Sequence, residues 1–369
     1  MRLGTCIALE LAVAAGAVAG AAVGVMHASR IVGDTLAAPE ARAATPGEER
    51  PPPITPLPHG ELRVVPSAEL VARPPAPTVF GAPDADLLAP LGAAAVTRAK
   101  LNLGGTSISL RLDFANGARA AFKPEQTNLQ SDPRREIAAY RLDRLIELGH
   151  VPPAKAGAVP LAEVIAHLDP AVRGAVVARL TAETLPRDGV LHGELSWWIP
   201  EIKYARIGRF SAEEADGRAQ WISYLQIGAA IPPAVRPLVE GIAACVLFDV
   251  LTDNPDRWSG NNVITSPDDK VFYIMDNTMA FSTLKIGSGM NVEILHRIQV
   301  FPRRLVERIR ALTEDRLAAE LEGGGGDTRL GRLLDPEQIR AVIHRRDNMM
   351  KYIDQLIAAH GESAVLALP

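Results

Sequence analysis

The chain is poor in cysteine and aromatic residues and has almost no excess of charge. Its 369 residues include two cysteines, 5% aromatic residues and a net charge of −4. Cys6 lies in an apolar N-terminal segment, so Cys245 is the single thiol of the rest of the chain and an internal disulfide framework is excluded. Basic residues are mixed with acidic ones and form no stripe with interleaved aromatics, so the composition disfavours nucleic acid as a partner.

Several catalytic motifs are also missing. The eight histidines show no paired spacing typical of a zinc site, and neither a Gly-x-Ser-x-Gly elbow nor a Walker phosphate loop occurs. Metal hydrolases, esterases and P-loop enzymes are therefore disfavoured. With 47% hydrophobic and 22% charged residues, the chain has an ordinary globular composition, and its length suits a two-lobed catalytic domain with extensions.

An apolar segment opens the chain. Leu3 to Met26 are almost entirely Leu, Ala, Val and Gly, with Glu10 as the one charge, and the run is long enough to span a bilayer. A signal peptide has the same layout, so we predict that residues 1–28 are either a signal peptide or a membrane anchor. The protein is therefore expected to be anchored to a membrane or exported, and the flanking charges do not decide the side.

A Pro- and Ala-rich stretch follows. Residues 29–90 contain crowded prolines between Pro51 and Pro58, and this composition predicts an extended linker. Beyond it, residues 91–200 show strand patterns around one amphipathic helix, and residues 201–369 show mainly helical periodicity. We therefore predict an α+β fold with two lobes, like that of an atypical protein kinase, with a mixed small lobe and a mainly helical large lobe.

Local signals place the elements within these lobes. Two strands fit residues 100–123, and a short strand from Ala118 to Phe122 delivers Lys123. Pro133 opens a helix that runs to Leu148. Further helices are expected at Leu161–Leu180, Val235–Thr252, Pro302–Leu321 and Pro336–Ala359, a strand at Glu194–Ile199, and a hairpin from Val263-Ile264 to Val271–Met275.

Five polar residues occur in the order that phosphoryl transfer requires. Asp256 precedes Asn261 by five positions in a polar loop, the offset that protein kinases use between the catalytic Asp and a metal-binding Asn. Asp276 follows a strand, where its carboxylate could bind a divalent ion held against the phosphates. Lys123 and Glu136, on a strand and the next helix, are the right types for an ion pair that aims an ammonium at phosphate oxygens.

A Gly-Gly pair lies between the first two strands. Gly104 and Gly105 could let backbone amides approach the nucleotide phosphates closely, although such pairs in hairpins are usually only turns. Each of the other candidates also has an ordinary structural explanation when taken alone. An Asp-Arg pair is usually a surface ion pair or a turn, for example. The conjunction of Lys, Glu, Asp, Asn and Asp in this order is what favours a kinase.

The motifs together resemble the Golgi secretory-pathway kinases, and more distantly the phosphoinositide and spore-coat kinases. The similarity covers roughly Leu101 to Ser282 and rests on Phe122-Lys123-Pro124, Arg135 to Arg144, Val151-Pro152-Pro153, Phe248 to Arg257 and Met275-Asp276-Asn277. The lack of disulfides, and Trp258 where a His is common, depart from the animal members and point to a bacterial or simplified one.

The resemblance implies a role for each matching residue. Lys123 would contact the nucleotide phosphates, Glu136 would position that lysine or the metal, Asp256 would be the catalytic Asp and Asp276 would bind metal, with Asn261 a weaker match. It implies ATP with Mg²⁺ or Mn²⁺ as cofactors, and a protein Ser/Thr or a glycan hydroxyl as acceptor. The alternative is a catalytically silent pseudokinase that serves as a membrane-tethered nucleotide-binding or interaction module.

Overall fold

The computed structural model describes residues 78–102, 105–259, 261–321 and 330–369, all within one compact unit that spans residues 72–369. The expected signal peptide or anchor, and most of the expected linker, lie outside the described residues. Helix α2, Asp84–Leu88, and the buried ring of Phe80 fall within the range for which a linker is expected. No described helix is both long enough and apolar enough to cross a membrane.

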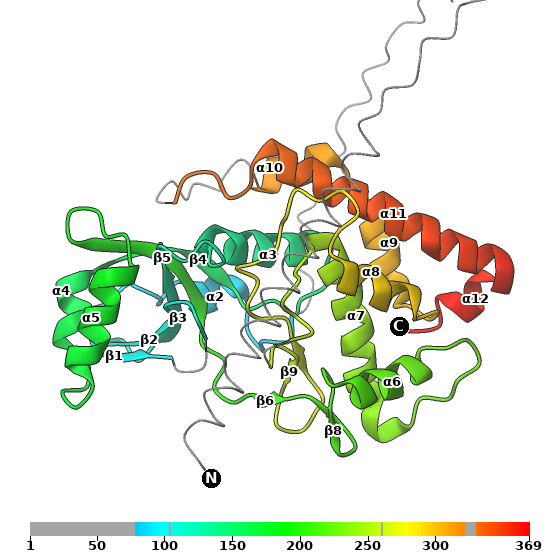
Figure 1. The fold of residues 1–369 in the computed structure, drawn as a ribbon, viewed down its shortest axis with the longest axis horizontal. Coiled ribbons are helices and arrows are strands. Elements are labelled where there is room, and N and C mark those ends of the chain that lie inside the picture. The colour runs from blue at the N-terminus through cyan, green and yellow to red at the C-terminus, as the bar shows by residue number, and fades with distance from the viewer. Residues whose placement is uncertain (1–77, 103–104, 260, 322–329) are drawn as a thin grey trace, which may run out of the picture. The chain divides into compact units, whose positions relative to one another are not determined.

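A five-stranded antiparallel sheet forms the small lobe (Figure 1). The strands are β1 (Val96–Leu101), β2 (Leu110–Phe114), β3 (Arg119–Pro124), β4 (Ala154–Pro160) and β5 (Val190–Trp197), in the order β1-β2-β3-β5-β4. β5 therefore begins four residues before its expected start at Glu194. The β3–β5 register sets Lys123 opposite Glu194, so both side chains lie on the same face of the sheet.

Two helices cover the other face of the sheet. Val164 of α4 (Leu161–Ala166) and Leu180 of α5 (Arg173–Glu183) share one buried cluster with Phe122 of β3. The prediction of a single helix over Leu161–Leu180 was wrong. The chain turns between the two helices at Pro170, which has no backbone N–H to continue an α-helix.

Helix α3, Pro133–Leu145, packs against the sheet face that carries Lys123. Its start is capped by Asp132, whose carboxylate accepts a 3.0 Å hydrogen bond from the backbone N–H of Arg134, and proline at the first helical position fits the cap. The buried side of α3 includes Ile137 and Leu142 and belongs to the core of the large lobe. This helix therefore connects the two lobes and brings Glu136 to their junction.

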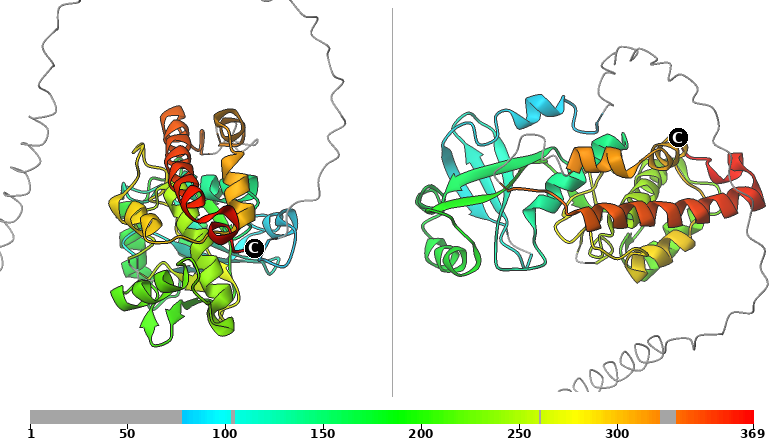
Figure 2. Two further views of the ribbon diagram at one scale, coloured as in Figure 1. Left: turned by 90° about the vertical axis from the view of Figure 1, so that its right-hand side faces the viewer. Right: turned by 90° about the horizontal axis from the view of Figure 1, so that it is seen from above.

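The large lobe is mainly helical. Its helices are α6 (Ala215–Tyr224), α7 (Arg236–Thr252), α8 (Gly289–His296), α9 (Arg303–Arg310), α10 (Glu314–Leu321), α11 (Pro336–His360) and α12 (Glu362–Val365). Figure 2 shows the sheet at one end of residues 78–369 and α11, which packs against α7, toward the other. One helix was expected over Pro302–Leu321, and this was wrong, because Thr313 caps a separate α10 with a 3.3 Å bond from the Arg316 N–H to its hydroxyl.

Short strands lie beside α7, next to the segments that carry Asp256 and Asp276. The expected hairpin is confirmed as β9 (Ile264–Thr265) paired with β10 (Phe272–Tyr273), and β6 (Lys203–Tyr204) adds a third strand. A second hairpin, β7 (Arg206–Ile207) with β8 (Phe210–Ser211), precedes α6. The segment between α7 and β9 holds Asp256, and Asp276 follows β10.

Candidate active site

Lys123 is the centre of a charged group that joins distant parts of the chain. Its ammonium donates a 2.6 Å hydrogen bond to Oε1 of Glu136 and a 2.8 Å bond to Oδ1 of Asp276, which lies 153 residues away in sequence. Lys123 and Glu136 are buried, whereas the Asp276 side chain is 47% exposed. The structure therefore brings together three of the candidates named from the sequence.

The charges in this group shift one another's protonation. Burial alone would lower the pKa of Lys123, but the carboxylates of Asp276 and Glu136 outweigh burial and raise the pKa above its ordinary value. The Lys123 charge in turn holds the pKa of Asp276 below its usual range. At neutral pH the lysine is therefore a fixed cation and Asp276 a fixed anion, which suits one to phosphate oxygens and the other to a metal ion.

The backbone at Asp276 adopts an unusual conformation. Its φ of 56° lies in the left-handed region, which is uncommon for residues other than glycine, although Asp and Asn adopt it more often than most. Such conformations cluster at functional sites. Thr278 supports it through a 3.2 Å bond from its hydroxyl to Oδ1 of Asp276. The other carboxylate oxygen, Oδ2, accepts no hydrogen bond from the described residues and is free to bind a ligand.

Asp256 lies in the loop after α7, half-buried, and is linked to Asp276 through one side chain. Its backbone N–H donates a 3.2 Å bond to Oδ1 of Asn254, and the amide of Asn254 donates a 3.0 Å bond to the backbone carbonyl of Asp276. Asn254 is fully buried, so this link is shielded from water. The Asp256 carboxylate accepts a 3.1 Å bond from the hydroxyl of Ser259.

Asn262, which the sequence analysis did not name, contacts Asp256 in place of Asn261. The amide of Asn262 donates a 2.9 Å bond to Oδ2 of Asp256, whereas Asn261 donates only its backbone N–H, at 2.8 Å, to the carboxylate of Glu213. Among the described residues, the Asn261 side chain bonds to neither Asp256 nor Asp276. The structure therefore does not bring Asn261 to the group, and its metal role stays a prediction.

The expected phosphate loop is anchored at one end. Gly104 lies outside the described residues, and Gly105 is exposed with open space around it. Past them, the buried Gln126 accepts a 2.7 Å bond from the N–H of Ile108 and donates a 3.1 Å bond to its carbonyl. Arg179 of α5 donates a 2.7 Å bond to the carbonyl of Thr106. The phosphate role of the glycines stays a prediction.

Glu194 is an acidic neighbour of Lys123 that the sequence analysis missed. It is 1% exposed, lies opposite Lys123 on β5, and accepts a short hydrogen bond from the hydroxyl of Ser196. Burial, together with the charge of Glu136, raises the pKa of Glu194 well above its usual range, although Lys123 opposes this. The expected strand began at Glu194, but only the β3–β5 register reveals which residue faces the lysine.

The donor set fits a divalent ion that is shared with a nucleotide. The described residues contain no cluster of three or more His, Cys, Asp or Glu side chains placed to hold an ion by themselves. Mg²⁺ is usually bound by one or two carboxylates plus substrate phosphates, and the free Oδ2 of Asp276 offers one such ligand. The residues therefore fit Mg²⁺ or Mn²⁺ carried in with a triphosphate.

Solved structures share this architecture, whereas no family model matches the sequence. The Golgi casein kinase with Mn and ADP bound matches with a TM-score of 0.60 and 15% identity, over 77% of this chain and 78% of that one. A further Golgi casein kinase structure gives 0.63 and 15%, over 79% of each chain. Hydra Fam20 with sugar gives 0.56 and 15%, over 74% of this chain and 89% of that one.

The chain has the fold of the Golgi casein kinase. The expected two-lobed α+β kinase-like fold is thereby confirmed. The likeness to the secretory-pathway kinases, read from motifs such as Asp256-Arg257, is confirmed for the fold. In this fold the lobes meet where Lys123, Glu136 and Asp276 converge.

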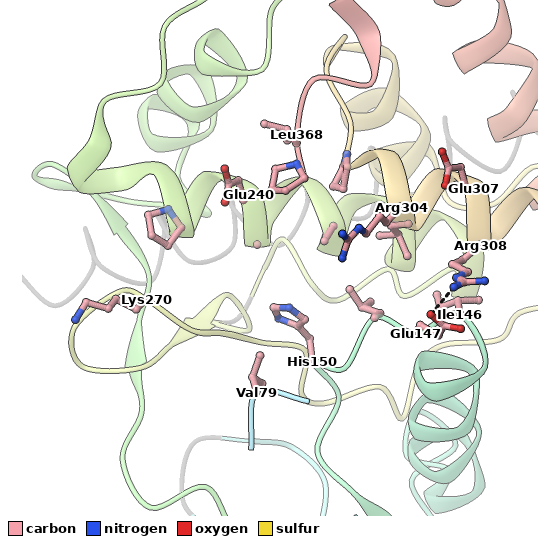
Figure 3. Close-up of a pocket in the computed structure, with 17 residues that line it drawn as sticks. Val79, Ile146, Glu147, His150, Glu240, Lys270, Arg304, Glu307, Arg308 and Leu368 are labelled. Carbon is pink, nitrogen blue, oxygen red and sulfur yellow. Dashed lines mark ion pairs between the residues drawn. The ribbon is translucent and has the colours of Figure 1, made fainter. Parts of the chain in front are cut away.

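A cavity of about 810 Å³ lies apart from this group (Figure 3). Gly241 and Ala244 of α7 line it, together with Ile146 and His150 beyond the end of α3. Glu136 lies in the first turn of α3, at the opposite end of that helix. None of the candidate site residues lines the cavity, so its size is no argument against the site between the lobes.

Proposed function

We propose that the protein is an ATP-dependent kinase that transfers the γ-phosphate of ATP to the hydroxyl of a protein Ser/Thr or of a glycan. The observation that carries the proposal is the contact of the Lys123 ammonium with both Glu136 and Asp276. Asp256 is connected to Asp276 through hydrogen bonds of the Asn254 side chain. Phosphoryl transfer depends mainly on positioning and electrostatics, and this group supplies both. The Golgi casein kinase, which shares the fold, has been solved with Mn and ADP.

Each residue then has a chemical role. Lys123 binds phosphate oxygens, and Glu136 holds its ammonium in place. The acceptor oxygen forms a bond to the γ-phosphorus, the bond from that phosphorus to the bridging oxygen of ADP breaks, and Asp256 accepts the hydroxyl proton. Asp276 would hold the divalent ion, which would supply positive charge against the phosphates.

The loop that holds Asp256 borders a groove at Ser259, whose hydroxyl bonds to the Asp256 carboxylate. A groove of about 380 Å³ is lined by Ser259 and Asn261 of the loop, by Tyr204, which is 57% exposed, and by Arg206 of the β7–β8 hairpin. Glu213 fixes the loop at this groove through its bond to Asn261 and a 2.7 Å bond from the N–H of Val263. We place the acceptor in this groove.

Replacing Asp256 by Ala tests the proposal. The variant should fold and bind ATP with Mn²⁺ as the wild type does, because Asp256 contacts neither Lys123 nor Oδ2 of Asp276 in this structure. Phosphate transfer to acceptor proteins or glycans, followed with radiolabelled ATP and by intact mass, should disappear. Transfer at the wild-type rate would refute the role of Asp256. Tyr204→Ala, as a companion variant, should raise the KM for the acceptor and leave the KM for ATP unchanged.

A pseudokinase is the second candidate, and the position of Asn261 is the observation that favours it. Without an Asn side chain at Asp276, the second metal position that protein kinases use lacks one expected ligand. A pseudokinase would bind ATP and Mn²⁺ in a thermal-shift assay and transfer no phosphate to any acceptor. A kinase would do both.

The compartment is a separate proposal, because it depends on residues 1–28, outside the described part of the chain. We propose that this segment anchors or exports the protein. A reporter fused after Pro369 and active only on one side of a membrane reports where the kinase-like domain lies. ATP must be present on that side for the proposed reaction to occur. The same fusion lacking residues 1–28 provides the control.

A further inference from the structure

Arg257, the residue after Asp256, is fully buried and paired with a carboxylate on α7. Its Nε lies 3.0 Å from Oδ2 of Asp249, and both side chains are 0% exposed. The charge of Asp249 keeps the Arg257 guanidinium ionised despite its burial, which by itself lowers the pKa of this group. Two such groups remain buried only when each satisfies the other and further hydrogen bonds use the remaining donors.

The remaining donors of Arg257 bind two other segments. Nη1 donates a 3.1 Å bond to the carbonyl of Asn262 and a short bond to the carbonyl of Met275, and Nη2 donates a 2.8 Å bond to Oδ1 of Asn277. One planar guanidinium therefore ties α7, the loop of Asp256 and the segment of Asp276 together. The ammonium of a lysine is a single point and lacks the fork that spans these acceptors.

Asn277 carries the contact on to the small lobe. Its backbone N–H donates a 2.9 Å bond to Oε1 of Glu136, and its Nδ2 donates a 3.2 Å bond to Oε2 of the same carboxylate. The amide orientation follows from the partners, because its oxygen faces a guanidinium and its nitrogen faces a carboxylate. Asn277 is 0% exposed, so water does not replace these bonds.

We propose that Arg257 and Asn277 form a positioning pair that holds Asp256, Asp276 and Glu136 in mutual register across the two lobes. The inference rests on the proposed kinase function and extends it to residues that touch neither nucleotide nor acceptor. Asp256 and Asp276 are each the direct neighbour of one member of the pair. A displacement of about 1 Å at a reacting group can cost on the order of 10²-fold in rate.

A purely structural pair would behave differently. Removing it would lower the stability of the whole domain and leave the turnover of each folded molecule unchanged. A positioning pair instead lowers kcat per folded molecule, and its two members act through each other. Their effects on kcat are therefore non-additive, as expected for residues in one hydrogen-bonded network.

The test is a double-mutant cycle of Asn277→Ala and Arg257→Lys, with kcat normalised to the folded fraction from urea unfolding. Each single change should lower kcat on the order of 10–100-fold, as for groups that support active-site ligands, while the KM for ATP changes less. The double variant should be no slower than the slower single one. Unchanged kcat per folded molecule, or multiplicative losses, would overturn the proposal. Ile309→Ala in α9 is the control that lowers stability outside the network.

Asn277→Asp keeps the test decisive if Arg257→Lys does not fold. The new carboxylate still accepts from Arg257 but sets an oxygen against Oε2 of Glu136 where a donor was. The proposal requires this variant, with kcat normalised to its folded fraction, to be as slow as Asn277→Ala. Wild-type kcat in Asn277→Asp would show that the bond to Glu136 is dispensable and would overturn the proposal.

The positioning pair can be tested even if the proposed kinase function is wrong. A wild type with no transfer to any acceptor refutes the kinase proposal alone. The pair is then tested by the rise in Tm that ATP with Mn²⁺ produces, which Asn277→Ala should reduce because Glu136 loses the side-chain bond to its Oε2 and orients Lys123 less firmly. An equal rise in wild type and Asn277→Ala would overturn the positioning role in that case.

Discussion

The amide of Asn262 donates a 2.9 Å hydrogen bond to the carboxylate of Asp256, while its neighbour Asn261 turns only a backbone N–H toward Glu213. Asn261 itself has a left-handed backbone conformation, with φ of 66°. This turn separates the directions of two adjacent asparagine side chains. Asn262 is thereby placed to orient the proposed catalytic carboxylate.

Asn262→Ala should therefore slow the proposed transfer more than Asn261→Ala. Loss of the amide frees Asp256 to rotate away from the acceptor hydroxyl, and misplacement of a reacting group costs up to about 10²-fold in kcat. Asn261→Ala should stay near the wild-type kcat. Steady-state assays with varied Mn²⁺ check both. A large loss in Asn261→Ala, with weaker Mn²⁺ dependence, would instead identify Asn261 as a metal ligand in the nucleotide complex.

Asp276→Asn should abolish the metal-dependent part of nucleotide binding. The substitution keeps the size of the side chain but removes the charge that pairs with Lys123 and that we propose binds a divalent ion. The rise in Tm on adding ATP with Mn²⁺ should fall toward the rise seen with ATP alone. Asp256→Ala is the control and should retain the full metal-dependent rise. Equal shifts in Asp276→Asn and wild type would place the metal elsewhere.

The sequence predicted much of this group because local signals carry it. Lys123 ends a short strand, and Glu136 lies one turn into a helix whose start is marked by Asp132 and Pro133, so both positions follow from neighbouring residues. Asp276 was likewise placed by the end of a short apolar strand. The order of the motifs led us to expect that Lys123, Glu136 and Asp276 lie close together, and the structure gives the distances between them.

The remaining features depend on contacts that local patterns do not encode. Glu194 faces Lys123 only because β5 pairs with β3 in one register, and a shift by one residue would send it to the other face. Asn262, and not Asn261, bonds to the Asp256 carboxylate, and no local sequence pattern distinguishes these two adjacent asparagines. The missed breaks at Pro170 and Thr313 are different, since a proline and a capping threonine signal them in the sequence.

Glu194→Gln should change how stability depends on pH. The pKa of Glu194 is raised in the folded protein, so the folded state holds this proton more tightly than the unfolded state. Its contribution to stability is full below the unfolded pKa and is lost as pH rises through the folded pKa. The difference in Tm, Glu194→Gln minus wild type, should therefore become more positive as pH increases from about 4.5, the ordinary pKa. A constant difference across this range would contradict the prediction.

Gln126→Ala should loosen the base of the expected phosphate loop. The change leaves the N–H and carbonyl of Ile108 unpaired in a buried position, at a cost of about 1–3 kcal/mol for each unsatisfied group. Urea unfolding should show this loss, and the KM for ATP should rise. Thr97→Ala removes an exposed 3.1 Å bond to the carbonyl of Asp113 and should change stability by less than about 0.5 kcal/mol. Equal stabilities of the two variants would show that Gln126 does not anchor the loop.

Gly193→Ala should displace Lys123 through the backbone. A Cβ on Gly193 would lie 2.2 Å from the carbonyl oxygen of Lys123 and 2.7 Å from Cα of Pro124, and neither backbone atom can rotate away. β3 and β5 must therefore separate where they deliver the lysine, so both Tm and kcat should fall. Gly174→Ala, in α5 with open space around it, should match the wild type or gain up to about 1 kcal/mol. If Gly193→Ala kept the wild-type kcat while Tm fell, the position of the lysine would tolerate strand separation, and the tight approach at Gly193 would serve the sheet alone.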